Sequence, residues 1–320
     1  MHFKWIFSAL ALGVIACLLP CSARADDGWD RAVFMLTEEN DSGLSDRHYT
    51  QGAKLTLLSS DYATNHFTAL VPSVGYHALR WKWGGEFGQQ MFTPEMIGET
   101  TLIQTDRPYA GWLYGGLIFQ QRGTNSRGSA VMETFRLDAG VAGPESQADN
   151  TQIWWHSVWG FQRPNGWRHQ IHTEVGVQLG YDRRHRYAWG ETWSFQLLPE
   201  GGVNLGNVRT DAHLGGSFRA GYNIPNEFGL NDSTHGVDFG AYIFGGVSGR
   251  AVLVDIFLDG NNFRNSHHIN KEPFVGEGWI GGAFATRHME VSVKHVQRTY
   301  EFQAQKETDG FTSLTLTVKF

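Results

Sequence analysis

The chain has 320 residues, and its 26 Lys and Arg against 32 Asp and Glu give a formal net charge of −6. This balance, with no run of five or more basic residues, excludes a basic nucleic-acid-binding protein. The 41% of apolar and 13% of aromatic residues can form a packed core, which excludes a disordered chain. After the first 25 residues no stretch approaches the 18 or more apolar residues of a membrane-spanning helix, which excludes a helical membrane protein.

The first residues have the features of an export signal. Lys4 supplies the positive start, an apolar stretch covers residues 6–19, and residues 23–25 have the small-x-small pattern that signal peptidase cleaves. We therefore expect residues 1–25 to be a signal peptide and residues 26–320 to form one exported domain. Both cysteines of the chain lie in this leader, so we expect the exported domain to contain no disulfide.

Most of the remaining chain alternates between apolar and polar residues, which is typical of β-strands. Residues 314–320 are the clearest case, because apolar side chains alternate there with Thr315, Thr317 and Lys319, and the segment ends on Phe320. A soluble sandwich alternates in the same way. The export signal, the long strands and the terminal Phe, which is similar to the assembly signal of bacterial outer-membrane barrels, favour a membrane barrel instead. We expect an all-β fold, a closed antiparallel transmembrane β-barrel with apolar side chains toward lipid and polar ones inside.

The pattern divides into about twelve strands, an even number, as in other single-chain bacterial barrels. The expected strands are 32–40, 48–59, 80–93, 109–122, 129–143, 169–184, 190–205, 209–222, 237–258, 272–286, 288–302 and 310–320. Residues 237–258 could be divided at Gly249, but we keep them as one strand because division would give thirteen. The connection at 60–79 is long for the side on which turns should be short, which leaves room for a small extra element.

Strand order brings three polar segments to one end of this barrel. With both termini in the periplasm, odd-numbered strands run outward, so the first, third and fifth connections lie at the external rim. The first connection follows Asn40 and Asp41 and leads to Thr50, the third contains residues 94–108, and the fifth contains His156. We therefore expect these groups to meet at the external rim.

Asn40 and Asp41 lie in the run Glu39-Asn40-Asp41-Ser42-Gly43, where oxygen-bearing side chains directly precede a glycine. Such oxygens suit a hard cation such as Ca²⁺, which binds six to eight oxygen ligands. The same residues suit an ordinary turn. The spacing is not that of an EF-hand, so both interpretations stay open.

His156 lies in a segment where Gln152 and His156 are four residues apart, as are Trp155 and Trp159. This spacing predicts a short helical element in the fifth connection, with a polar and an aromatic face. One interpretation is an aromatic anchor at the rim with an incidental histidine. The other is a general base held against an apolar wall, with Gln152 fixing its ring.

Two further polar residues are candidates for the same end of the barrel. Thr50 has the parity of Lys54 and Thr56, which predicts that its hydroxyl points into the lumen, where most threonines are structural. Arg107, in the run Asp106-Arg107-Pro108, suits a structural ion pair with Asp106. Its guanidinium could alternatively bind an anionic lipid headgroup, because guanidinium pairs with phosphate through two hydrogen bonds.

An ordered series of motifs resembles the LpxR-type lipid A deacylase family. The motifs are Glu39-Asn40-Asp41, Asp46-Arg47-His48-Tyr49-Thr50-Gln51-Gly52, Asp106-Arg107-Pro108-Tyr109-Ala110-Gly111, Gly143-Pro144 leading to Gln152 and His156, and Gly166-Trp167. They extend over nearly all of the exported domain, including the closing Phe320. Two positions differ from the family pattern. Residues 94–106 contain no Lys or Arg where characterised members use a lysine, and Gln162 stands where a glutamate follows the histidine.

The resemblance implies a monomeric twelve-stranded barrel, inserted by the barrel-assembly machinery into the bacterial outer membrane among its lipids. It implies a calcium-dependent esterase that removes the 3'-linked acyloxyacyl chain of lipid A in lipopolysaccharide. Asn40, Asp41, Thr50 and His156 would be the catalytic residues at the external rim. Asn40 and Asp41 would bind the Ca²⁺, and His156 would be the general base. Separately from the resemblance, we expect Gln152 and Arg107 to contact substrate.

Two other functions stay open for such a barrel. One is a different outer-membrane lipid hydrolase, such as a phospholipase with a serine nucleophile, although the sequence contains no Gly-x-Ser-x-Gly elbow. The other is a non-enzymatic pore, which would need none of the residues named above.

Overall fold

A computed structural model describes residues 32–40, 47–63, 71, 73–225 and 239–320. The predicted signal peptide therefore lies outside the described residues. The strands are β1 (Val33–Glu39), β2 (His48–Leu58), β3 (Tyr62–Ala63), β4 (Tyr76–Thr93), β5 (Ala110–Asn125), β6 (Ala130–Ala142), β7 (Glu174–Trp189), β8 (Trp193–Gly206), β9 (Arg209–Tyr222), β10 (Phe239–Asp255), β11 (Phe274–Thr286), β12 (Met289–Arg298) and β13 (Asp309–Lys319). The helices are η2 (Pro144–Ser146), α2 (Ala148–Trp159), η3 (Trp167–His169) and α3 (Ile256–Asp259).

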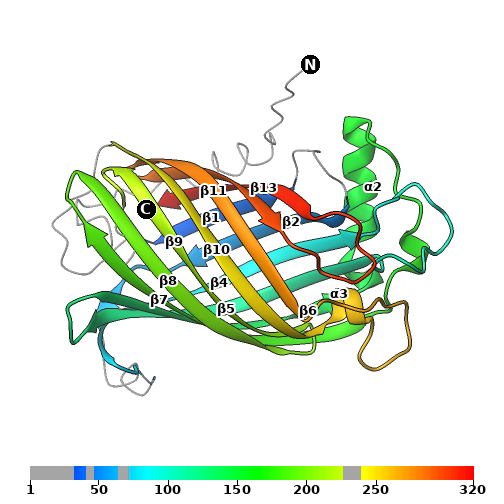
Figure 1. Cartoon of the computed structure of the whole chain (residues 1–320), viewed down its shortest axis with the longest axis horizontal. Coiled ribbons are helices and arrows are strands. Elements are labelled where there is room, and N and C mark those ends of the chain that lie inside the picture. Colours follow the sequence, from blue (N-terminus) through cyan, green and yellow to red (C-terminus); the bar gives the residue numbers. More distant parts are fainter. Residues whose placement is uncertain (1–31, 41–46, 64–70, 72, 226–238) are drawn as a thin grey trace.

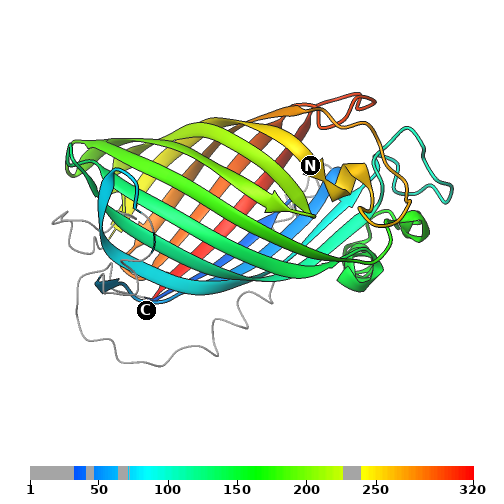
Figure 2. The same ribbon diagram turned by 90° about the horizontal axis from the view of Figure 1, so that it is seen from below.

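The strands form one closed antiparallel barrel, as predicted (Figures 1 and 2). Each long strand pairs with its neighbours along the chain, and β1 closes the ring by pairing with β13 from Val33 opposite Lys319 to Glu39 opposite Ser313. The two-residue β3 pairs only with β4, whereas β2 also pairs directly with β4. The wall therefore consists of twelve long strands, and β3 is the small extra element of the 60–79 connection.

The observed strands agree with the expected ranges, with few shifts. The segment predicted at 237–258 is the single strand β10, without a division at Gly249. The strand predicted to begin at 169 begins instead at Glu174. Residues 167–169 form η3, and the backbone N–H of Ile171 donates to the carbonyl of Tyr109, so this stretch is tied to the preceding connection.

The outer surface of the wall carries the apolar half of the alternating pattern. Exposed apolar side chains include Leu57, Trp83, Phe87, Leu117, Leu137, Val175, Val177, Leu179, Leu205, Leu214, Ile243, Val247, Ile280 and Phe284. They form the predicted lipid-facing belt. Among the described residues, no helix combines the length and apolarity that a bilayer crossing requires.

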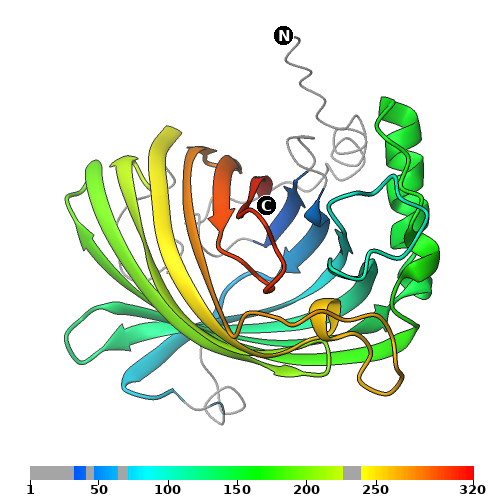
Figure 3. The same cartoon turned by 45° about the vertical axis from the view of Figure 1, so that its right-hand side comes forward.

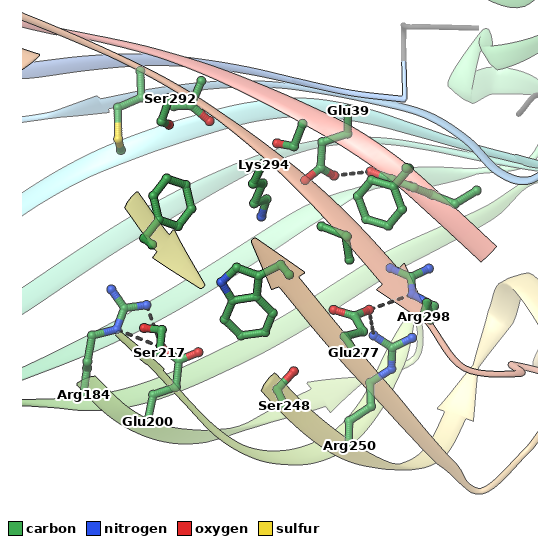
Figure 4. Close-up of a pocket in the computed structure, with 18 of the residues that line it drawn as sticks. Glu39, Arg184, Glu200, Ser217, Ser248, Arg250, Glu277, Ser292, Lys294 and Arg298 are labelled. Carbon is green, nitrogen blue, oxygen red and sulfur yellow. Dashed lines mark hydrogen bonds and ion pairs between the residues drawn. The ribbon is translucent and has the colours of Figure 1, made fainter. Parts of the chain in front are cut away.

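The lumen contains the polar half of the pattern, as predicted. A cavity of about 600 Å³ lies inside the barrel and is lined largely by charged and hydroxyl side chains (Figure 4). Glu277 accepts hydrogen bonds from Arg250 at 2.9 Å and from Arg298 at 2.6 Å, and Arg184 pairs with Glu200 at 2.7 Å. Opposite charges thus neutralise one another across the interior.

The connections that contain α2 and α3 lie at one end of the barrel, which we call the helix end (Figure 1). Here an aromatic and aliphatic cluster fills the lumen. The short helix α3 contributes Ile256 and Phe257, both fully buried, and the ring of Phe257 stacks on Phe92 with centroids 4.2 Å apart. Tyr49 and Phe311 belong to the same cluster.

A buried ion cluster packs against these rings. Glu301, in the connection between β12 and β13, accepts hydrogen bonds from Arg107 at 3.1 Å, Arg250 at 3.0 Å and Arg298 at 3.3 Å. The Arg107 guanidinium also lies 4.6 Å from the centroid of Phe92. Burial alone would raise the pKa of the Glu301 carboxyl, but the guanidinium groups of Arg298 and Arg107 hold that pKa far below its ordinary value.

We expect Glu301→Gln to destabilise the barrel by about 3 to 5 kcal/mol, because it leaves the buried Arg107 guanidinium without its counter-charge and leaves Arg250 and Arg298 to share Glu277. A lowered carboxyl pKa stabilises the folded state above the carboxyl's ordinary pKa of 4.5, and this contribution decreases as the pH falls below it. Urea unfolding at pH 7 should therefore separate wild type from variant, and the difference should narrow below about pH 4.

Glu307→Gln is the matched control, because Glu307 lies in the same connection but pairs with Arg47 at the surface. We expect that variant to lose no more than about 1 kcal/mol. Equal stability losses in the two variants would contradict the role given to Glu301.

Candidate active site

Two hydroxyl groups meet at the helix end of β2 and β4. The Oγ1 atoms of Thr50 and Thr93 lie 2.6 Å apart, and the Thr93 side chain is 0% exposed. Tyr49 and Phe92, which precede them, are paired in register and belong to the lumen cluster. Because successive side chains of a strand point to opposite faces, Thr93 lies on the outer face of the wall, and its contact places the Thr50 hydroxyl there too.

The predicted lumen orientation of Thr50 is therefore wrong, and a β-bulge is the reason. The β2–β4 register shifts between Tyr49 and Gln51, which adds one residue to β2 at this point. Tyr49 and Gly52 then share the lumen face. A Cβ atom at Gly52 would lie 2.0 Å from the Tyr49 hydroxyl, so any other residue there would displace the Tyr49 side chain. Counting every second residue back from Lys54 places Thr50 on the wrong face, because the bulge interrupts the alternation between them.

The helix α2 packs on the outside of the wall at this end. Its first residue, Ala148, is buried in a cluster with Met91, Tyr109 and Trp167. The helix approaches closely because position 111 is glycine, where a Cβ atom would lie 2.4 Å from that of Ala148. Figures 1 and 3 show α2 lying across the strand ends rather than along them. The predicted short helical element is thus confirmed.

Gln152 and His156 both lie on the buried face of α2, one turn apart as predicted. The Gln152 Oε1 accepts a hydrogen bond from the Trp167 Nε1 at 2.7 Å. Trp167 in turn packs on Tyr109, with ring centroids 5.0 Å apart. Gln152 therefore ties α2 to the segment that follows it and to the wall beneath.

The His156 ring is held by the main chain. Its Nδ1 donates a hydrogen bond to the backbone carbonyl of Gln162, and the Phe161 ring meets it edge-on at 5.6 Å between centroids. A carbonyl can only accept, so Nδ1 carries the proton and Nε2 of the neutral ring is left as an acceptor. The turn is made by Gly160, which has a left-handed φ of 69° and ends α2.

Asn40 lies where three strands meet. It adopts a left-handed conformation with φ 65°, which Asn tolerates better than most residues. Its backbone N–H donates to the carbonyl of Thr312 at 2.7 Å, and its side-chain Nδ2 donates to the carbonyl of Tyr49 at 2.5 Å. The Asn40 side chain is therefore fixed beside the backbone that carries Thr50.

The predicted calcium ligands can be compared only in part with the structure, because Asp41 lies outside the described residues. The described neighbours of Asn40 offer amide and hydroxyl oxygens, which are the donor types that Ca²⁺ accepts. Within the described ranges, no group of three or more His, Cys, Asp and Glu side chains could hold a metal ion. The fit to Ca²⁺ therefore rests on the types of oxygen donor that lie near Asn40.

The carboxylates of Asp106 and Asp309 both contact His48, at the start of β2. The Nδ1 of His48 lies 2.8 Å from a carboxylate oxygen of Asp309, and its Nε2 lies 3.5 Å from Asp106. Burial alone would raise the pKa of Asp106, but hydrogen bonds from His48 and from the backbone N–H groups of Glu95 and Arg107 lower it. An ionised Asp106 thus ties the connection after β4 to the start of β2.

Arg107 is not brought together with His156. Its side chain is 1% exposed and lies on the lumen side, in the ion cluster around Glu301. The structure thus places this residue in a structural ion pair, although with Glu301 rather than with Asp106. Because the Arg107 side chain is almost completely buried, the structure does not support its predicted contact with substrate.

Sequence reasoning missed Thr93 and the carbonyl of Gln162. The register of β2 against β4 could have identified Thr93, but only with knowledge of the bulge. The Gln162 contact is made by the main chain and leaves no signature in side-chain types. It explains how glutamine can stand at this position without loss of the histidine's partner.

Comparisons with known proteins agree with this architecture. The family model described as outer membrane protein LpxR matches residues 10–320. The solved structure of LpxR from Salmonella typhimurium is 19% identical in sequence with a TM-score of 0.70, and the alignment covers 90% of this chain and 100% of that one. The β-domain of the Bordetella autotransporter Brka is 9% identical with a TM-score of 0.48, covering 91% of this chain and 98% of that one.

No curated protein matches this chain. The family model, in contrast, covers nearly all of it, and the structural likeness to Salmonella LpxR shows the same barrel fold. The chain therefore belongs to the family of outer membrane proteins described as LpxR.

Proposed function

We propose that this outer-membrane protein is an esterase that removes the 3'-linked acyloxyacyl chain of lipid A, with His156 as general base. The observation that carries the proposal is the location of His156. The buried face of helix α2 holds it against the outer wall of the barrel, where lipid lies, rather than in the lumen. A histidine that served a pore would line the interior.

The His156 ring is prepared to accept a proton. Its Nδ1–H is engaged by the Gln162 carbonyl, which fixes the ring and stabilises the charge that forms when Nε2 takes a proton from water. The resulting hydroxide bonds to the ester carbonyl carbon, the bond from that carbon to the sugar 3'-oxygen then breaks, and the sugar oxygen takes the proton back from Nε2. General-base assistance of this kind is typically worth about 10² to 10⁴ in rate. The Thr50 hydroxyl, held by Thr93, would position the water or the carbonyl.

Ca²⁺ is the proposed cofactor, with Asn40 and Asp41 as its ligands. When bound, a calcium ion would polarise the ester carbonyl and stabilise the negative charge on its oxygen. The left-handed turn at Asn40, fixed by its bond to the Tyr49 carbonyl, brings this part of the chain next to Thr50. This arrangement supports calcium dependence.

Lipid A is the proposed substrate because its acyl chains lie in the outer leaflet. If the helix end is the external end, they can reach the outer wall from the side without leaving the bilayer. The barrel has no unpaired edge among its long strands, which supports a monomer once the barrel-assembly machinery has inserted it.

The test is mass spectrometry of lipid A treated with purified protein in the presence of Ca²⁺. We expect wild type to release the 3'-linked acyloxyacyl chain, and His156→Ala and a chelator each to abolish release. Ser157→Ala is the matched control, since Ser157 is the next residue on α2 and is exposed. Full release by folded, heat-modifiable His156→Ala would exclude His156 as the base.

We expect Gln162→Ala to retain this activity, because the group that holds His156 is the backbone carbonyl of residue 162 and not its side chain. The assay is the same measurement of released acyl chain. A loss as large as that of His156→Ala would instead assign a chemical role to the Gln162 side chain.

A passive pore is less well supported. The cluster around Phe257 and the ion cluster around Glu301 occupy the lumen at the helix end. We therefore expect no steady open-channel conductance in planar bilayers. A wild-type protein with stable, ohmic channels and no esterase activity would favour the pore instead.

A further inference from the structure

The helix α2 has an apolar flank beside its buried face. We define this flank as Trp154, Trp155, Val158 and Trp159; Trp154 and Val158 are four residues apart, as are Trp155 and Trp159, so each pair is in contact along the helix. Trp154 and Val158 are both 52% exposed. The ring of Trp155 lies 6.1 Å from Trp154 and 5.7 Å from Trp159 between centroids, so the flank is a continuous aromatic surface.

Polar residues border this flank on the side of Trp154 that faces away from Trp155. Asn150 and Ser157 are exposed there, and the Ser157 hydroxyl donates to the carbonyl of Trp154. The buried face, with Gln152 and His156, points to the barrel wall. The helix thus has three sides, one on protein, one polar and one apolar, and Trp154 and Val158 are exposed on the apolar one.

The apolar flank adjoins the lipid-facing belt. The helix lies across the ends of the strands on one side of the barrel, and it contacts β4 and β5 (Figure 3). Farther along β2, β4 and β5, the outward side chains of Leu57, Phe87 and Leu117 are exposed. In a membrane these side chains contact hydrocarbon, so the flank of α2 begins where an apolar surface already exists.

We propose that the apolar flank of α2 is a lipid-binding surface, seated in the acyl chains of the membrane leaflet at the helix end of the barrel. Tryptophan is enriched at the border between hydrocarbon and headgroups, and a helix with one apolar and one polar side lies in the plane of that border. α2 is already held crosswise by the wall, so it needs no further ordering to lie there.

This surface is distinct from the proposed catalytic groups, which occupy the buried face of the same helix. Lipid contact on one flank would fix the depth of α2 relative to the bilayer, and hence the depth of His156. The inference does not require that the protein is an esterase. Its test therefore uses no activity measurement.

The test is the membrane depth of a nitroxide placed on either flank. With Cys17 and Cys21, the two cysteines of the chain, replaced by serine, single cysteines are introduced by Val158→Cys and Ser157→Cys. Residues 157 and 158 are adjacent and both exposed, so the two labels differ mainly in the side of α2 on which they lie. The labelled proteins are reconstituted in vesicles of phosphatidylethanolamine and phosphatidylglycerol, and power saturation is measured with oxygen and with a water-soluble nickel chelate.

We expect the label at 158 to be accessible to oxygen and shielded from nickel, and the label at 157 to show the reverse. Trp155→Cys and Asn150→Cys, which are five residues and so roughly 140° apart around the helix, provide a second pair if either first variant fails to fold. Equal nickel access on both flanks would overturn the proposal, because α2 would then lie in water. Dipolar broadening between labels at 158 would overturn it as well, since the flank would then contact a second copy of the chain.

Discussion

Backbone hydrogen bonding imposes the first constraint on this molecule. A chain in hydrocarbon has no water to satisfy its N–H and C=O groups, so its strands must close into a ring. The antiparallel pairing of β1 with β13 closes it. Closure forces the alternating pattern to divide cleanly, with apolar side chains outside and charged ones inside, and it leaves the strand ends as the places where irregular structure can form.

The buried ion cluster and the proposed catalytic groups both lie at the helix end, on opposite faces of the barrel wall. On the lumen side, Glu301 and its arginines neutralise one another beneath α3. On the outer side, Thr50 and Thr93 share a hydrogen bond, and α2 packs against β4 and β5. A bulge of a single residue in β2 decides on which face Thr50 lies. The lumen packing stiffens the wall on which the proposed catalytic groups rest.

Much of this fold could be predicted from the sequence, because alternation is a direct consequence of strand geometry in a membrane. The ranges of β9 and β10 and the helical spacing of Gln152 and His156 follow from it. The orientation of Thr50 could not be predicted, since a bulge changes parity without a clear change in composition. The Gln162 carbonyl that holds His156, and the pairing of Arg107 with a residue nearly 200 positions away, depend on tertiary structure alone.

The protonation of the His156 ring is the most direct test of the proposed chemistry. Nitrogen NMR of the protein with labelled histidine, with His156 assigned by its absence in a His156→Asn variant, distinguishes the two tautomers. The bond to Gln162 predicts that the single proton of the neutral ring lies on Nδ1 and that Nε2 carries none. A neutral ring with its proton on Nε2 would contradict the account, because the nitrogen that must accept a proton from water would already carry one.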